Sequence, residues 1–276
     1  MQKVYNKKVN FYYFDQVSTA PLTSISKELD EAGFYGILVP YTVGASNHFI
    51  ETTRALDTKQ KIKYIIGVRP HTVSPQYLAM MIKSINDIQP GRVWVNFVAG
   101  LIREDEIESK GSMFSEEFER SWEERKLYLS KYLPIFKDFC ITKEIKTKIC
   151  MAGMTNEVFS LVEKNADYNI AAYEPYLRMN GFRKITKPRI ISICPFIEDD
   201  QKIIDEAKND KDKPQDIVFT TTQGLTDIIN TLKAEGINNI LLFTYGSNNK
   251  EHDKQKYKII EFVKEYKANY KEKYWF

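Results

Sequence analysis

A polar amide stands inside an apolar run of the sequence. Residues 92–100, RVWVNFVAG, have the valines and aromatic residues of a buried strand, with Asn96 near its end and Gly100 at its close. A buried amide that lacks hydrogen bonds costs about 1–3 kcal/mol. Either the protein itself or a bound ligand must therefore satisfy Asn96.

Two groups that bind anions or move protons follow another apolar segment. Arg69 and His71 stand in GVRPHTVSP, residues 67–75, where a strand is expected to end. Arginine in such a place holds an anionic substrate or pairs with a neighbouring carboxylate, and both interpretations stay open. Histidine titrates near neutral pH, so His71 is a candidate for proton transfer, with an ordinary loop residue as the alternative.

A second histidine follows an earlier strand. His48 lies in GASNHF, residues 44–49, next to Asn47. The pair caps a helix, or the imidazole faces a pocket and takes part in proton transfer. The third histidine, His252, lies in the charged C-terminal segment, and we expect it to be inert.

A turn of small residues offers a place for a phosphate. In AGMTNEVF, residues 152–159, the amides of Gly153, Met154 and Thr155 open a helix. Free amides and the positive end of the helix dipole bind phosphate groups well. The alternative is an ordinary helix start capped by Thr155.

Other classes of site lack support. Cys140, Cys150 and Cys194 have no metal-ligand or redox-pair spacing, and no metal site is expected. Their odd number and the absence of an apolar signal segment at the N-terminus favour a reducing cytoplasm. The balance of 40 basic and 37 acidic residues gives no global reason to expect nucleic acid. No run approaches the roughly 18 apolar residues of a membrane helix.

The elements that position these groups alternate along the chain. The expected helices cover residues 23–33, 46–58, 74–91, 115–139, 155–166, 200–209, 224–236 and a C-terminal segment. The expected strands cover residues 9–15, 35–41, 62–70, 92–100, 147–154, 167–175, 188–197 and 237–246, whereas residues 211–219 are expected to form a loop with an extended end.

Eight β–α units joined by short links favour a closed barrel. Several strands lack polar alternation, as parallel strands covered on both faces do. No strand carries the glycine-rich dinucleotide motif at its exit, which argues against an open doubly wound sheet. We therefore expect an α/β fold, a (β/α)8 TIM barrel with short insertions, in one domain over residues 1–276. Chemistry in such a barrel lies at the strand ends, where Asn96, Arg69 and Gly153 stand.

Several segments resemble the bacterial luciferase-like flavin-dependent monooxygenase superfamily, and most closely its alkanesulfonate monooxygenase branch. The similarity covers roughly residues 30–180 and lies in an ordered series of motifs. These are Arg69-Pro70-His71, Ser74-Pro75, Gly91-Arg92 and the strand end Asn96 to Gly100.

This resemblance implies the same barrel and an FMN site. A separate flavin reductase would supply reduced FMN, which reacts with O2 to oxidise a small organic substrate. Asn96 would face the flavin, and Ala99 would belong to the same cofactor site. Trp122 or Ser121 would stand near the phosphate, and Gly153, Met154 and Thr155 would form the phosphate turn. His48 is the implied acid or base, with His71 as second choice, and Arg69 the anion or flavin contact. A homodimer is expected by analogy.

The chain also departs from that branch. Ala99 replaces a threonine, Ala45 stands in place of a cysteine, and Ser192 and Cys194 stand in place of an arginine and a histidine. The groups that bind a sulfonate are largely missing, so we expect a different substrate. Two alternatives stay open: a deazaflavin-dependent hydride-transfer enzyme, and a flavin-binding protein without catalysis.

Overall fold

The computed structural model describes most of the chain. The described residues are 8–14, 21–41, 46–57, 59–98, 122–173, 185–209, 216–244 and 249–271. The expected strand ends at Ala99 and Gly100 and the segment 174–184 lie outside these ranges.

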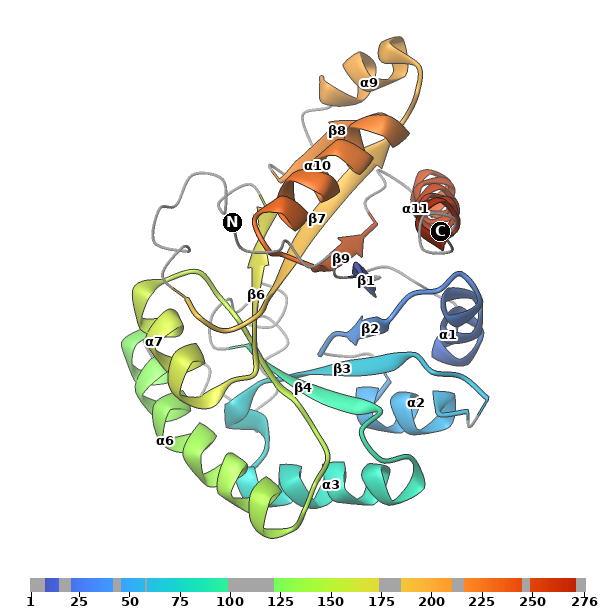
Figure 1. Ribbon diagram of the computed structural model, residues 1–276. Coiled ribbons are helices and arrows are strands. Elements are labelled where there is room, and N and C mark those ends of the chain that lie inside the picture. Colours follow the sequence, from blue (N-terminus) through green and yellow to red (C-terminus); the bar gives the residue numbers. More distant parts are fainter. Residues whose placement is uncertain are drawn as a thin grey trace.

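Eight parallel strands close into a barrel (Figure 1). They follow one another around the ring in chain order, and the last pairs with the first, Tyr12 lying opposite Leu241. The fold predicted from the sequence, a (β/α)8 barrel, is therefore confirmed. The barrel strands are β1 (Asn10–Phe14), β2 (Gly36–Val39), β3 (Lys63–Val68), β4 (Val93–Val98), β5 (Ile149–Ala152), β6 (Tyr168–Ala172), β7 (Arg189–Ile197) and β9 (Asn239–Phe243).

A ninth strand lies outside the ring. Strand β7 has nine residues. Its first half pairs with β6 and β9 in the barrel, and its second half pairs with β8 (Ile217–Thr220). Figure 1 shows β8 and the helices beside it standing above the barrel. The extended end that was expected in residues 211–219 forms most of β8, where Phe219 packs on Phe196 with ring centroids 5.5 Å apart. Residues 211–215, expected to form a loop, lie outside the described residues.

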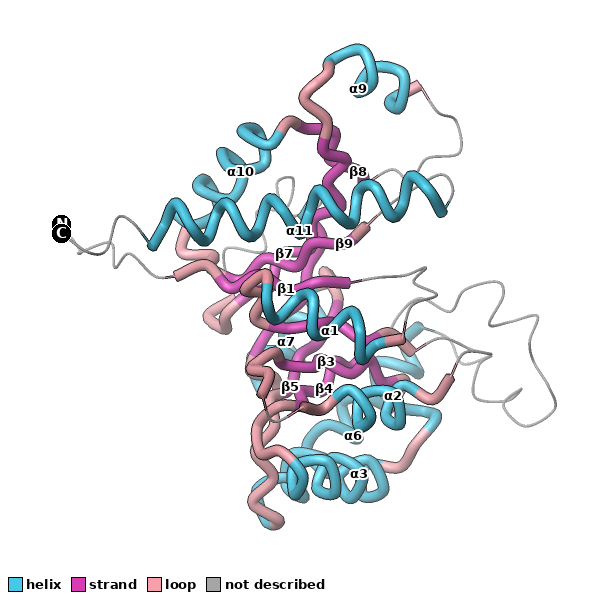
Figure 2. Tube along the Cα trace, turned by 90° about the vertical axis from the view of Figure 1, so that its right-hand side faces the viewer, coloured by secondary structure: helices cyan, strands magenta, loops and turns pink. Residues whose placement is uncertain are grey.

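The helices surround the strands, as Figure 2 shows. Asn47, Ser74, Thr155 and Thr221 each cap a helix by accepting hydrogen bonds from its first amides, which satisfies donors that have no partner within the helix. The helices are α1 (Leu22–Glu31), α2 (His48–Ala55), the short 3-10 helix η1 (Pro70–Thr72), α3 (Pro75–Ile88), α6 (Trp122–Thr142), α7 (Asn156–Asn165), α9 (Gln201–Lys208), α10 (Thr222–Ala234) and α11 (Asn249–Lys271).

Side chains of the barrel strands alternate between two apolar layers. The lumen is filled by a cluster that includes Tyr12, Ile65 and Trp94, whereas Val95 and Phe97 belong to the layer between strands and helices. Successive residues of a strand point to opposite faces. Asn96 therefore points into the lumen, above Trp94 toward the carboxyl end of the barrel.

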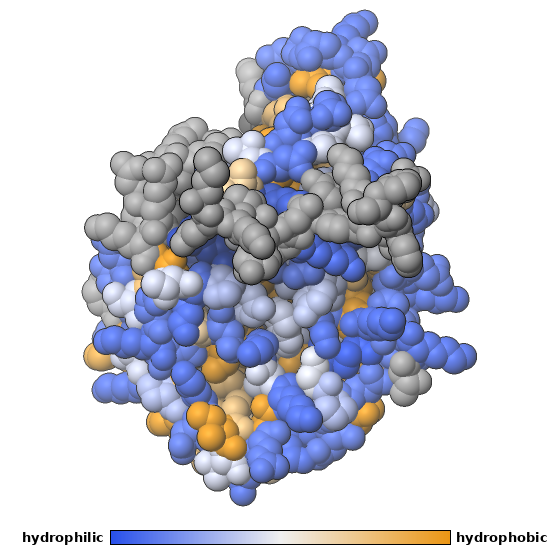
Figure 3. Space-filling model, viewed as in Figure 1, coloured by the Kyte–Doolittle hydropathy of each residue, from blue (hydrophilic) through white to orange (hydrophobic). Residues whose placement is uncertain are grey.

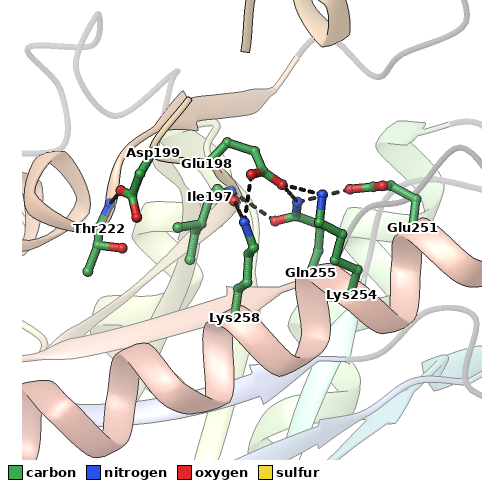
Figure 4. A network of polar contacts seen from close by, with 8 residues as sticks. All are labelled: Ile197, Glu198, Asp199, Thr222, Glu251, Lys254, Gln255 and Lys258. Atoms are coloured by element: carbon green, nitrogen blue, oxygen red, sulfur yellow. Dashed lines mark hydrogen bonds and ion pairs between the residues drawn. The ribbon is translucent and has the colours of Figure 1, made fainter. Parts of the chain in front are cut away.

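A buried carboxylate ties β7 to α11 (Figure 4). Glu198 is only 5% exposed and accepts from the Nζ atoms of Lys254 and Lys258 at 2.6 and 2.7 Å. Burial raises the pKa of Glu198, but the hydrogen bonds from both lysines outweigh this effect and hold that pKa below its ordinary value. Gln255 accepts from the Ile197 amide at 2.9 Å and completes the attachment.

Two further findings concern the described residues only. None of their helices is both long and apolar enough to cross a bilayer. Among the same residues, no three His, Cys, Asp or Glu side chains gather where they would hold a metal ion.

Candidate functional site

Asn96 lies in the lumen without a partner for its oxygen. The residue is 3% exposed, and its Oδ1 is buried with no hydrogen bond to any described residue. In the neighbouring strands it lies opposite Gly67 and Cys150. The described part of the protein thus provides no hydrogen-bond donor for this buried acceptor.

His48 stands at the start of α2 beside an aromatic group. Asn47 caps the helix by accepting from the amides of Phe49 and Ile50. The His48 ring meets Tyr41 edge-on, with centroids 5.5 Å apart, and its Nε2 is buried with no partner among the described residues. Burial lowers the pKa of His48 to about 4, and the Gly67 backbone opposes this effect only in part. The imidazole is therefore neutral at pH 7 and able to accept a proton.

Gly67 brings these two groups into one region. A Cβ atom at this position would lie 3.1 Å from the Tyr41 amide and 3.3 Å from the Val39 carbonyl. Only glycine permits this approach of the end of β2 to β3 without a shift. Gly67 lies opposite Asn96 in the sheet, and a hydrogen bond with its backbone raises the pKa of His48 against the effect of burial. Sequence analysis did not select it, although glycine inside an apolar strand signals a close approach.

Arg69 and His71 follow β3. Arg69 is 7% exposed, and its carbonyl accepts from the Thr72 amide at 3.0 Å and hydroxyl at 2.8 Å, which starts η1. Its position continues the alternation of Ile65 and Gly67, so it lies on the lumen side of the strand end. The backbone of His71 lies in η1, but its side chain is outside the described set.

The turn after β5 leads into helix α7. Gly153 has a φ of +149°, and a Cβ atom there would lie 2.9 Å from Val158 Cγ1. Asn169 Nδ2 donates to the Gly153 and Met151 carbonyls, at 3.1 Å in each case. Sequence analysis missed Asn169, although an amide in the apolar run of β6 is the same signal that drew attention to Asn96.

The helix start after this turn carries its own negative charge. Thr155 accepts from the Val158 amide at 3.4 Å and so caps α7. A hydrogen bond from Thr155 also lowers the pKa of Glu157 in the first helical turn. The capped-helix interpretation therefore describes Thr155, and a phosphate would share this end of the helix with a carboxylate.

The other predicted residues have mixed outcomes. Ala99 lies outside the described residues, and Trp122 begins α6 with a side chain that is not described. Cys194 is 2% exposed, and burial raises the pKa of its thiol. His252, which was expected to be inert, lies on α11 and is 4% exposed.

The described candidates gather at one sector of the barrel mouth. His48, Arg69, Asn96 and Gly153 follow or end strands β2, β3, β4 and β5, which are neighbours in the ring. The carboxyl ends of parallel strands meet at one edge. This sector combines a neutral imidazole, an amide oxygen without a partner, an arginine and a glycine turn.

No family model matches the chain. Solved structures with the same fold over nearly the whole chain include the following three. EDTA monooxygenase from Chelativorans sp. BNC1 is 9% identical, covers 94% of this chain and 93% of its own, and gives a TM-score of 0.65. Coenzyme F420-dependent tetrahydromethanopterin reductase from Methanopyrus kandleri is 14% identical, with 94% and 98% covered and a TM-score of 0.61.

The third is the oxygenating constituent of 3,6-diketocamphane monooxygenase from Pseudomonas putida, in complex with FMN. It is 12% identical, with 94% of this chain and 96% of its own covered and a TM-score of 0.59. At such identities the likeness concerns the fold alone. The chain has the (β/α)8 barrel fold of these two monooxygenases and this reductase.

Proposed function

We propose that the protein is a monooxygenase that uses reduced FMN and O2 to oxidise a small organic substrate. The observation that carries the proposal is the Asn96 Oδ1, a buried acceptor without a partner that faces the lumen near the mouth of the barrel. The fold shared with two monooxygenases supports it. We expect a substrate other than an alkanesulfonate, because Ser192 and Cys194 stand where that branch has an arginine and a histidine.

The described residues suit a flavin. The isoalloxazine ring presents N–H donors, and Asn96 Oδ1 is an acceptor that needs one. Gly153 turns the chain between β5 and α7 with a φ of +149°. Arg69 brings a positive charge to the end of β3. When bound, reduced flavin would supply the two electrons that activate O2.

The protein's own groups would handle protons and water. His48, neutral at pH 7, would accept a proton from the substrate or pass one through its Nε2. Tyr41 and Phe49 lie against the imidazole and would exclude water from it. His71 remains the second candidate for this role.

A deazaflavin-dependent hydride transfer is the second candidate function. The coenzyme F420-dependent reductase has the same fold and a higher identity, 14%, than the two monooxygenases. Asn96 would serve either cofactor, because both rings carry N–H donors. A flavin-binding protein without catalysis is the third, and it rests on the departures at Ala99, Ser192 and Cys194.

The partners are also part of the proposal. A separate reductase would deliver reduced flavin, and a second copy of the chain would form a homodimer. Tyr77 and Met80 on α3 and Leu127 on α6 are exposed apolar side chains that a partner would cover. Figure 3 shows apolar patches at its lower edge, where α3 and α6 lie. Three unpaired cysteines fit a cytoplasmic location.

A flavin titration tests the proposed function. Reduced and oxidised FMN are titrated anaerobically, and the reduced complex is then mixed with O2. We expect tighter binding of reduced FMN and a transient absorbance before the oxidised spectrum returns. Turnover of reduced deazaflavin without O2 consumption would support hydride transfer instead. Binding of oxidised FMN alone, with no transient, would support the non-catalytic alternative.

A further inference from the structure

A second cavity opens at the opposite end of the barrel from Asn96. It has a volume of about 460 Å³, within the usual range for small-molecule sites. It lies where β1, β6, β7 and β9 begin, on the left side of the barrel in Figure 2. Its lining includes Lys8, Asn10, Tyr168, Lys187, Arg189 and Asn239.

Positive charge dominates this cavity. Lys8, Lys187 and Arg189 line it, and Glu235 is the one acidic residue in its lining. Arg189 donates one hydrogen bond, from a terminal guanidinium nitrogen to the Ile185 carbonyl at 2.9 Å, and its Nε is buried with no partner among the described residues. A guanidinium in this state has donors left for a carboxylate or phosphate.

The contrast with the neighbouring strand argues against a purely structural role. The N-terminal end of a barrel normally serves stability, and charges there are then paired. Lys148, at the start of β5, follows this rule and pairs with Asp167 at 3.2 Å. None of the ion pairs among the described residues involves Lys8 or Arg189.

Neutral groups in the cavity are held in place. Asn10 donates to Asn239 Oδ1 at 3.1 Å, and Asn239 donates to the Arg189 carbonyl at 3.3 Å. Tyr168 forms an aromatic wall, stacked on Trp94 with centroids 5.1 Å apart and planes 18° apart. Burial raises the pKa of Tyr168, so its hydroxyl stays protonated and able to donate.

We propose that this cavity is a second binding site, for a small aromatic anion that carries two negative charges as a phosphate or dicarboxylate. Arg189 takes the anionic group as a two-pronged donor, and Lys8 and Lys187 add charge. The aromatic part packs against the wall formed by Tyr168. The site is separate from the barrel mouth and does not rest on the proposed flavin chemistry.

Calorimetric titration of the whole protein with phenyl phosphate tests the proposal. Phenol and inorganic phosphate are titrated as the two halves of the probe, and phthalate as the carboxylate counterpart. We expect phenyl phosphate to bind with a Kd below about 1 mM and more tightly than either half. Preference for phenyl phosphate or for phthalate identifies the anionic group.

Variants locate the binding. Arg189→Gln should weaken phenyl phosphate by about ten-fold or more, because a charged hydrogen bond is lost. Lys146→Gln is the matched control: it removes one positive charge from a neighbouring cavity beside Trp94 and should change the Kd less than about two-fold. If Arg189→Gln does not fold, two other variants replace it: Lys8→Gln, at an exposed residue, and Arg189→Lys, which keeps the charge. Each should bind phenyl phosphate more weakly than the wild type.

Three outcomes would overturn the inference. The first is that no anion binds at concentrations up to about 10 mM. The second is that the wild type and the Arg189 and Lys8 variants bind phenyl phosphate with equal affinity. The third is that Asn96→Leu, which alters only the barrel mouth, abolishes binding. A failed flavin titration with retained phenyl phosphate binding would refute the proposed function and leave this site standing.

Discussion

The replacement of Asn96 by leucine separates a structural amide from a ligand-binding one. Leucine has the same branched side-chain skeleton, with two methyl groups in place of the polar atoms. A buried acceptor without a hydrogen bond costs about 1–3 kcal/mol, and Asn96 Oδ1 is such an acceptor. Asn96→Leu should therefore raise the free energy of unfolding of the ligand-free protein by about 1–3 kcal/mol, a gain that urea denaturation would measure.

The same change should weaken flavin binding. A ring N–H left without an acceptor in the complex costs a similar 1–3 kcal/mol, which corresponds to about five- to 150-fold in Kd. Fluorescence titration with reduced and oxidised FMN measures this loss. A substitution that raises the stability of the ligand-free protein and weakens flavin binding identifies a residue that serves a ligand.

Asn169→Leu is the matched control. This asparagine is fully buried on the outward side of β6, where its Nδ2 donates to the Met151 and Gly153 carbonyls, although its Oδ1 also lacks a partner. Asn169→Leu removes both of these hydrogen bonds and should lower stability by about 1–3 kcal/mol. Should Asn96→Leu destabilise the protein as much as the control, the protein itself satisfies Asn96 and the reasoning is refuted.

Three further predictions concern His48, Gly67 and Glu198. The pKa of His48 in the folded protein, about 4, lies below its unfolded value, so the protein should lose about 2 kcal/mol of stability as pH falls from 7 to 5. His48→Gln should remove this loss, and urea denaturation at the two pH values measures it. Gly67→Ala should destabilise by about 1–3 kcal/mol, because its Cβ would press on the end of β2, and thermal unfolding would show a lower Tm. Glu198→Gln should cost about 1.5–3 kcal/mol, because it removes the charged hydrogen bonds from two lysines that keep contact with water. Glu261→Gln, in an exposed pair, should cost less than about 0.5 kcal/mol. Since the pKa of Glu198 is depressed, its contribution to stability is present above the unfolded pKa and is lost as pH falls through the folded one.

Local patterns in the sequence were enough to predict the barrel. Each barrel strand is an apolar run long enough to be recognised alone, and residues such as Asn47, Ser74 and Thr155 mark helix starts through bonds to the next few amides. These interactions depend on near neighbours in the chain. The sequence also showed that Asn96, a buried amide in such a run, needs a hydrogen-bond partner from either the protein or a ligand.

What the sequence could not supply depends on contacts between distant segments. Strand β8 exists because the long β7 leaves the ring and offers an edge for pairing, a property of the closed barrel. His252 is buried because α11 packs against the barrel, although its sequence neighbours are charged. The link through Gly67 between His48 and Asn96 arises only when three strands lie side by side. The sequence by itself therefore determined the elements and most of the groups that could do chemistry, whereas tertiary packing decided which of them meet, which lose their charge and which lack a partner.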